Sequence, residues 1–261
     1  MEAPRITFIG AGNVATHLVR AFHDAGAEVV QVCARTPEHA RQLAESVGAE
    51  AITDPGKADP SVDFCIVCVG DSAVADVARR LPLMHGIVVH TSGSVEMDVL
   101  RCASARVGVL YPLQTFSRER SLDVSRVPFF TEGSDADVLA AIDALASLVC
   151  GSVAHADSAH RQYLHVAGVL GCNFPNYLIG CAIDMLAAAG YGAEVLRPLV
   201  EETVAKVFDA GATAAQTGPA RRGDVATIEK HRAMLPEGEA CIYDMLSRAI
   251  MAKYNNGNEQ N

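Results

Sequence analysis

Apolar residues in the N-terminal part of the chain form short runs, which are typical of buried strands. Between the runs, apolar positions recur at helical spacing. We predict strands at Ile6–Ile9, Glu28–Ala34, Ala49–Ile52, Phe64–Val69, Ile87–His90, Arg106–Leu110, Phe129–Thr131 and Ser152–Ala154. We predict helices at Val14–Ala25, Pro37–Val47, Ser72–Arg80 and Ala136–Val149. This alternation predicts an α/β fold with a doubly wound, largely parallel sheet.

After about Asp157 the pattern becomes helical, with no competing strand signal. The predicted helices are Asp157–Ala189, with a kink near Pro175, and Ala193–Ala210, Asp224–Leu235 and Gly238–Lys253. The change of pattern predicts two domains. They are an α/β domain over residues 1–156 and an all-α domain over 157–254, followed by a polar tail over 255–261 that we expect to be disordered.

The first predicted strand and helix are joined by the glycine turn Gly10-Ala-Gly-Asn-Val-Ala15. Gly10 permits a tight turn, and Gly12 lets a pyrophosphate approach the backbone and the first N–H groups of the helix, at Asn13 and Val14. The small Ala15 allows the helix to pack closely on the strand. A purely structural turn is the alternative, but a preceding strand and a following helix are the context that favours a dinucleotide site.

The second predicted strand ends at Arg35 and Thr36. Proteins that bind NAD carry an acidic residue here, which holds the ribose 2′-hydroxyl. A guanidinium instead pairs with a 2′-phosphate, and a hydroxyl donates to it. The alternative is an exposed arginine beside a helix cap. Together with the glycine turn, the pair predicts NADP(H) as the cofactor.

Small and polar residues follow the other strands, where ligands of such sheets bind. The predicted cofactor contacts are Gly70, Asp71 and Ser72, and the predicted substrate contacts are Ser92, Ser94 and Gln114. Ordinary helix caps would explain the first two of these turns as well.

Polar residues follow one face of the apolar helix predicted after Asp157. Arg161 and His165 are four residues apart, and Asn173 and Asn176 lie close to the same face. Such residues must find partners or line a cavity. The alternative is a core histidine that is hydrogen-bonded to the neighbouring domain.

Charge and cysteine usage narrow the function classes. The formal net charge is −10, which argues against a nucleic-acid-binding surface. Cys65 and Cys68 are three apart on a predicted strand and therefore face opposite sides, so we expect buried, reduced thiols and no metal. Reduced thiols and the absence of a signal-peptide pattern predict a cytoplasmic protein.

Asn173 and Asp184 interrupt the apolar stretch Val166–Gly190, which favours a buried helix of a domain or dimer core over a membrane span.

The order and spacing of several motifs resemble the bacterial NADP oxidoreductases that have a Rossmann-like domain and a C-terminal helical domain of unknown function. The motifs are Gly10-Ala-Gly-Asn-Val-Ala15, Thr91-Ser-Gly-Ser94, Tyr111-Pro-Leu-Gln-Thr-Phe116, Arg161 through Asn173, and Gly218-Pro-Ala-Arg-Arg-Gly-Asp224 with His231. The wider architecture is similar to pyrroline-5-carboxylate reductase, ketopantoate reductase and the β-hydroxyacid dehydrogenases. The resemblance implies a homodimer formed through the helical domain.

One feature departs from these relatives. The β-hydroxyacid dehydrogenases use a catalytic lysine at the start of the interdomain helix, whereas this chain has no lysine between Lys57 and Lys206. His165 is the positional substitute and Tyr163 the alternate, because an unperturbed imidazole titrates near neutrality and can donate a proton.

Two hypotheses follow. The first is an NADPH-dependent reductase of a small, anionic carbonyl or imine. In it His165 donates the proton, Asn173 orients the substrate together with Asn176, and Arg222 beside Asp224 pairs with a substrate carboxylate. The second, favoured by the missing lysine, is an NADP(H)-binding sensor or scaffold without turnover.

Overall fold

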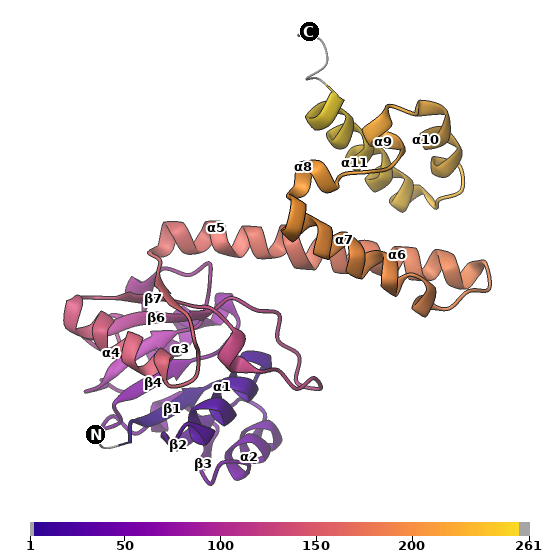
Figure 1. Cartoon of the computed structure of the whole chain (residues 1–261). Helices are drawn as coiled ribbons and strands as arrows, with labels where there is room; N and C mark the ends of the chain where they lie inside the picture. Colours follow the sequence, from indigo (N-terminus) through magenta and orange to yellow (C-terminus); the bar gives the residue numbers. More distant parts are fainter. Residues whose placement is uncertain (1–2, 256–261) are drawn as a thin grey trace. The chain divides into compact units, whose positions relative to one another are not determined.

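A computed structural model describes residues 3–255, so the predicted tail beyond Asn255 lies outside the described residues (Figure 1). Its N-terminal part is built on an eight-stranded sheet with the order β3-β2-β1-β4-β5-β6-β7-β8. The strands are β1 (Arg5–Ile9), β2 (Glu28–Cys33), β3 (Glu50–Ile52), β4 (Phe64–Val67), β5 (Ile87–His90), β6 (Val107–Pro112), β7 (Phe129–Gly133) and β8 (Val153–His155). Neighbours are parallel except β6 and β7, which pair antiparallel. The predicted doubly wound, largely parallel sheet is confirmed.

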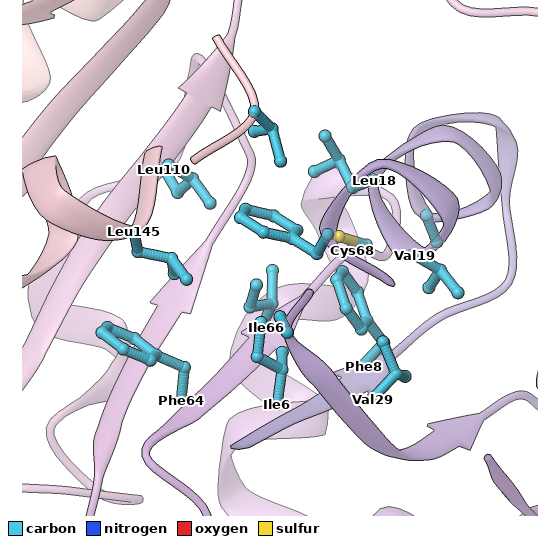
Figure 2. Packing of buried hydrophobic residues seen from close by; sticks show 14 of the residues in the cluster. Ile6, Phe8, Leu18, Val19, Val29, Phe64, Ile66, Cys68, Leu110 and Leu145 are labelled. Atoms are coloured by element: carbon cyan, nitrogen blue, oxygen red, sulfur yellow. The ribbon is translucent and has the colours of Figure 1, made fainter. Parts of the chain in front are cut away.

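Helices cover both faces of the sheet. One face packs against α1 (Asn13–Asp24), α2 (Pro37–Glu45) and α4 (Ala136–Ser147), and the other against α3 (Val74–Arg80) and the 3₁₀ turn η3 (Met97–Leu100). Figure 2 shows the first of these two cores, to which Phe8 of β1 and Leu18 and Val19 of α1 belong. This arrangement leaves the carboxyl ends of β1, β2, β4, β5 and β6 at one edge of the sheet.

Alternation along the strands decides which core each side chain joins. Ile6 and Phe8 belong to the first core and Ile9 to the second. Cys65 and Cys68 likewise join different cores, as their spacing predicts. Both thiols are free, and burial raises the pKa of each, to about 12 for Cys68.

The chain divides into two compact units, of which one ends at Asn173 and the other begins at Phe174. The sequence pattern suggests an earlier division, at 156/157, where strand signals stop. The difference is α5 (Ser158–Gly168) with the π-helical turn η5 (Val169–Asn173), which belong to the α/β unit. Arg161 explains this, because its fully buried side chain ties α5 to the sheet.

All the secondary structure in the described residues of the second unit is helical, as predicted. It contains α6 (Phe174–Ala188), η6 (Ala193–Val195), α7 (Arg197–Ala210), α8 (Ala212–Ala215), α9 (Pro219–Arg222), α10 (Val225–Arg232) and α11 (Glu237–Asn255). The irregularity expected near Pro175 is the π-helical turn directly before Phe174. By length and composition alone the helical run Ser158–Ala188 could span a membrane, which on its own is weak evidence. The expected burial of this apolar stretch is not found within the described chain, where none of its most apolar window is buried.

Candidate active site

The glycine turn after β1 has a backbone that requires its first glycine. Gly10 has a φ of +129°, and its N–H donates to the carbonyl of Cys33 over 2.7 Å. A Cβ at Gly10 would overlap the carbonyl oxygen of Cys68. A Cβ at Gly12, in contrast, would meet no protein atom within 4 Å. The turn therefore opens to a space in which a ligand can reach the backbone.

Helix α1 begins at this space with unsatisfied donors. Gly12 is its N-cap, no side chain caps its first turn, and no acidic residue stands there. The exposed Asn13 and the half-buried Val14 therefore present backbone N–H groups to an anion. This arrangement fits a pyrophosphate.

Arg35 and Thr36 lie exposed at the carboxyl end of β2, directly before α2. The Thr36 hydroxyl makes no capping hydrogen bond, although Thr36 is the N-cap of α2. Within residues 3–255, Arg35 forms no ion pair, so its guanidinium is available. Both groups fit a 2′-phosphate.

The loops after β4 and β5 meet through side chains. The Ser94 hydroxyl donates to the Asp71 carboxylate over 2.5 Å. The Ser92 hydroxyl accepts the N–H groups of Ser94 and Val95, each over 3.1 Å, and so shapes the turn. The cap geometry considered as an alternative is thus present at Ser92, while Gly70 and Ser72 are exposed beside Asp71.

Tyr111 at the end of β6 faces this loop. A Cβ on Gly93 would lie 2.6 Å from Cζ of Tyr111, so the ring packs directly on the glycine. The Tyr111 hydroxyl lies 3.4 Å from Nδ1 of His165 on α5. Burial raises the pKa of Tyr111, and the Asp71 carboxylate raises it further. Tyr111 is therefore a neutral hydroxyl that can donate a proton, paired with an exposed imidazole.

The polar face predicted for this helix groups Arg161 with His165, but in the structure Arg161 is buried against the sheet. Its guanidinium forms an ion pair with Glu132 of β7 and donates to the carbonyls of Ala156, over 3.1 Å, and Val95, over 2.8 Å. The side chain is fully buried. Arg161 therefore fixes the first turn of α5, while His165, one turn later, remains exposed at the sheet edge.

His90 is buried at the end of β5, directly before the turn that carries Ser92. Its Nδ1 accepts the Ser92 N–H over 3.2 Å, and its Nε2 has no hydrogen-bond partner among the described residues. Burial lowers the pKa of His90 to about 4, and the charge of Arg161 contributes in the same direction. A neutral imidazole thus supports the turn that carries Ser92.

The other predicted residues occupy more exposed positions. Gln114 is exposed, and its Oε1 accepts from the N–H of Thr115 over 2.7 Å. Tyr163 and Asn173 are exposed in the α/β unit, and Asn176 and Arg222 are exposed in the helical unit.

Asp224 caps α10, because its carboxylate accepts both the N–H and the hydroxyl of Thr227, over 3.1 and 2.7 Å. These two bonds lower the pKa of Asp224.

Tyr111 is a site residue that the sequence patterns do not single out, although it lies within one of the motifs. Its position at the carboxyl end of a strand was the available signal, because the neighbouring strand ends supplied the other candidates.

Comparisons with known proteins agree with this geometry. Residues 5–92 match the family model described as NADP oxidoreductase, coenzyme F420-dependent, and residues 127–250 match a domain of unknown function, DUF2520. The comparison with curated proteins gave no match. Among solved structures, a "putative NADP oxidoreductase" from Bacteroides fragilis is 38% identical, with a TM-score of 0.89 over 96% of this chain and 98% of the other.

More distant structures share the fold. A reductive aminase from Aspergillus terreus in complex with NADPH and ethyl-5-oxohexanoate is 18% identical, with a TM-score of 0.65 over 96% of this chain and 90% of the other. A 1-pyrroline-5-carboxylate reductase from Streptococcus pyogenes is 12% identical, with a TM-score of 0.64 over 96% of this chain and 99% of the other. The resemblance noted from the motifs is confirmed, and the chain belongs to the NADP oxidoreductase family in which an NADP oxidoreductase domain is combined with DUF2520.

Proposed function

We propose that this NADP oxidoreductase reduces a C=O or C=N bond of a small, anionic substrate. The observation that carries the proposal is the contact between the Tyr111 hydroxyl and Nδ1 of His165 at the carboxyl edge of the sheet. NADPH, when bound, supplies the hydride. The reduced oxygen or nitrogen also needs a proton, which a group of the protein must hold within reach.

The nucleotide is held by the groups at the ends of β1, β2 and β4. The open backbone at Gly12 and the first turn of α1 receive the pyrophosphate. Arg35 and Thr36 receive the 2′-phosphate, and the turn at Gly70, Asp71 and Ser72 lies along the nicotinamide half.

Selectivity for the nucleotide tests the role of Arg35. Wild-type protein should bind NADPH more tightly than NADH. Arg35→Ala should weaken NADPH binding by roughly 10- to 100-fold without affecting NADH, because a charge-assisted hydrogen bond is lost. Arg41→Ala, on the exposed side of α2, is the control. Equal wild-type affinities for the two nucleotides would contradict the assignment.

Proton donation is assigned to Tyr111 and His165 together. The Tyr111 hydroxyl is kept protonated by burial and donates to the substrate atom, and His165, which is exposed, returns a proton from solvent. This extends the hypothesis based on His165 alone. Tyr163, the alternate donor, is 79% exposed, and its hydroxyl forms no hydrogen bond to a described residue, which favours Tyr111.

Substrate selection is assigned to polar and charged side chains that the sequence analysis singled out. Ser92, Ser94 and Gln114 supply hydroxyl and amide groups near the sheet edge, and Asn173 and Asn176 supply amides that orient the substrate. Arg222 supplies the charge that would pair with a carboxylate. One structure with the same fold is named a 1-pyrroline-5-carboxylate reductase, and 1-pyrroline-5-carboxylate is an anionic imine. This name supports the choice of substrate class.

A screen of NADPH oxidation tests the reaction. Candidate 2-ketoacids, cyclic imine carboxylates and aldehydes are offered with NADPH, and loss of the reduced nicotinamide is followed by absorbance. We expect turnover with carboxylate-bearing carbonyls or imines, and weaker turnover in Arg222→Ala. Tight NADPH binding without turnover on any class would instead support a sensor or scaffold.

We also propose a cytoplasmic homodimer. Large apolar side chains are exposed on the helical unit, among them Tyr177 and Phe208, with Phe208 85% exposed. Burying one such side chain is worth about 1.5–3 kcal/mol, so packing of these side chains against a second copy of the chain would stabilise a dimer. Light scattering at micromolar concentration should give the mass of a dimer, and the mass of a monomer would contradict this.

The acidic charge and the free thiols support a cytoplasmic protein that does not bind nucleic acid.

A further inference from the structure

The connection between β6 and β7 crosses onto α1. We call residues 113–123 of this connection the strap. The Phe116 ring packs on the ring of His17 in α1, with 5.4 Å between centroids. Nε2 of His17 donates to the carbonyl of Ser117 over 2.9 Å. These two contacts fix the next residue of the strap, Arg118, beside the glycine turn.

Arg118 reaches the centre of that turn. Its Nη2 donates to the carbonyl of Ala11, between Gly10 and Gly12. Arg118 is half-buried and forms no ion pair within the described chain. The strap thus carries a formal positive charge to the point where α1 begins.

The hydrogen bond to the Ala11 carbonyl uses only part of the donor capacity of the Arg118 guanidinium. Arginine has five N–H donors in a planar fork, and Ala11 takes one of its nitrogens. A phosphate is a stronger partner than a neutral carbonyl, because a charge-assisted bond is about twice as strong as a neutral one. The first turn of α1 attracts the same anion through its free N–H groups.

We propose that Arg118 binds the pyrophosphate of NADP(H), together with the N–H groups of the first turn of α1. The proposal rests on the nucleotide site assigned above to the glycine turn and does not depend on the substrate that is reduced. It differs from the role of Arg35, because NADPH and NADH share the pyrophosphate and differ in the 2′-phosphate.

Nucleotide titrations separate these two roles. Arg118→Met should weaken the binding of NADPH and NADH by the same factor, roughly 10- to 100-fold, which corresponds to one charge-assisted hydrogen bond. Arg35→Ala should weaken NADPH alone. Arg120→Met, in the same strap and exposed to solvent, is the matched control and should bind both nucleotides as wild type does.

A second variant separates binding from folding. Arg118→Gln keeps an N–H donor for the Ala11 carbonyl but removes the charge, so the strap stays anchored while the affinity falls as in Arg118→Met. Circular dichroism and melting temperature confirm the fold of each variant. Wild-type affinity for both nucleotides in folded Arg118→Gln would overturn the proposal, as would an equal loss in Arg120→Met or a loss confined to NADPH. A failed reductase hypothesis gives a different result, namely absent turnover with intact binding.

Discussion

Glu132 on β7 and Arg161 on α5 form an ion pair in which the arginine side chain is fully buried and the Glu132 side chain is 19% exposed. Asp157 caps α5 by accepting the N–H of His160 over 2.9 Å, so the helix starts at a fixed position. The pair then sets the direction of its first turn. His165, one turn beyond Arg161, reaches Tyr111 because of this arrangement.

Replacing Arg161 should lower the free energy of unfolding. Arg161→Ala leaves Glu132 and two backbone carbonyls without their partner, and we expect unfolding in urea to show a loss of roughly 3–5 kcal/mol. Arg197→Ala removes an exposed arginine that pairs with Glu201 over 3.6 Å, and it should change little. Similar losses in the two variants would show that the buried pair does not hold α5.

Substitutions of the two glycines in the first turn, Gly10 and Gly12, should affect different properties of the protein. Gly10→Ala places a Cβ on the Cys68 carbonyl at a φ of +129°, so we expect a lower melting temperature. Gly12→Ala meets no protein atom, so the fold should keep its stability, while the new methyl group blocks the pyrophosphate and lowers the affinity for NADPH. A Gly12→Ala protein that binds NADPH like wild type would place the nucleotide elsewhere.

Stability should depend on pH through His90. Its pKa is about 4 in the fold and about 6.5 in the unfolded chain, so the unfolded chain takes up a proton first as the pH falls. The stabilising contribution of the neutral imidazole is complete above pH 6.5 and is lost as the pH falls towards 4, by an amount on the order of 3 kcal/mol.

The variant His90→Asn keeps an acceptor for the Ser92 N–H and does not titrate. Urea unfolding between pH 4 and 6.5 should therefore give a flatter stability profile than wild type. His39→Asn, on the exposed side of α2, is the control and should keep the wild-type slope. An unchanged slope in His90→Asn would assign the pH dependence to other groups.

Local sequence patterns predicted the parts of the molecule that local physics determines. The glycine turn at Gly10 and the arginine at Arg35 follow single strands, so neighbouring residues suffice to place them. The apolar periods located the sheet strands to within about two residues, which is the usual uncertainty of element ends.

Other features depend on contacts between distant segments. The contact of Tyr111 with His165 joins β6 to α5, and the contact of Arg118 with Ala11 joins the strap to the first turn. No spacing along the chain encodes either one. The burial of Arg161 was also hidden, because an arginine four residues before a histidine looks the same whether it faces solvent or Glu132. For the same reason the sequence pattern groups α5 with the helices that follow it.

The central claim is that Tyr111 and His165 deliver the proton in an NADPH-dependent reduction, and its most direct test is the turnover of Tyr111→Phe on a substrate found in the screen. This variant keeps the ring that packs on Gly93 and removes the hydroxyl that contacts His165. We expect NADPH affinity and melting temperature to match wild type while turnover falls by roughly 10²–10⁴-fold, the usual range for a lost general acid. Tyr163→Phe, which removes an exposed hydroxyl of α5, should turn over at the wild-type rate. A folded Tyr111→Phe protein that binds NADPH and keeps wild-type turnover would contradict the claim.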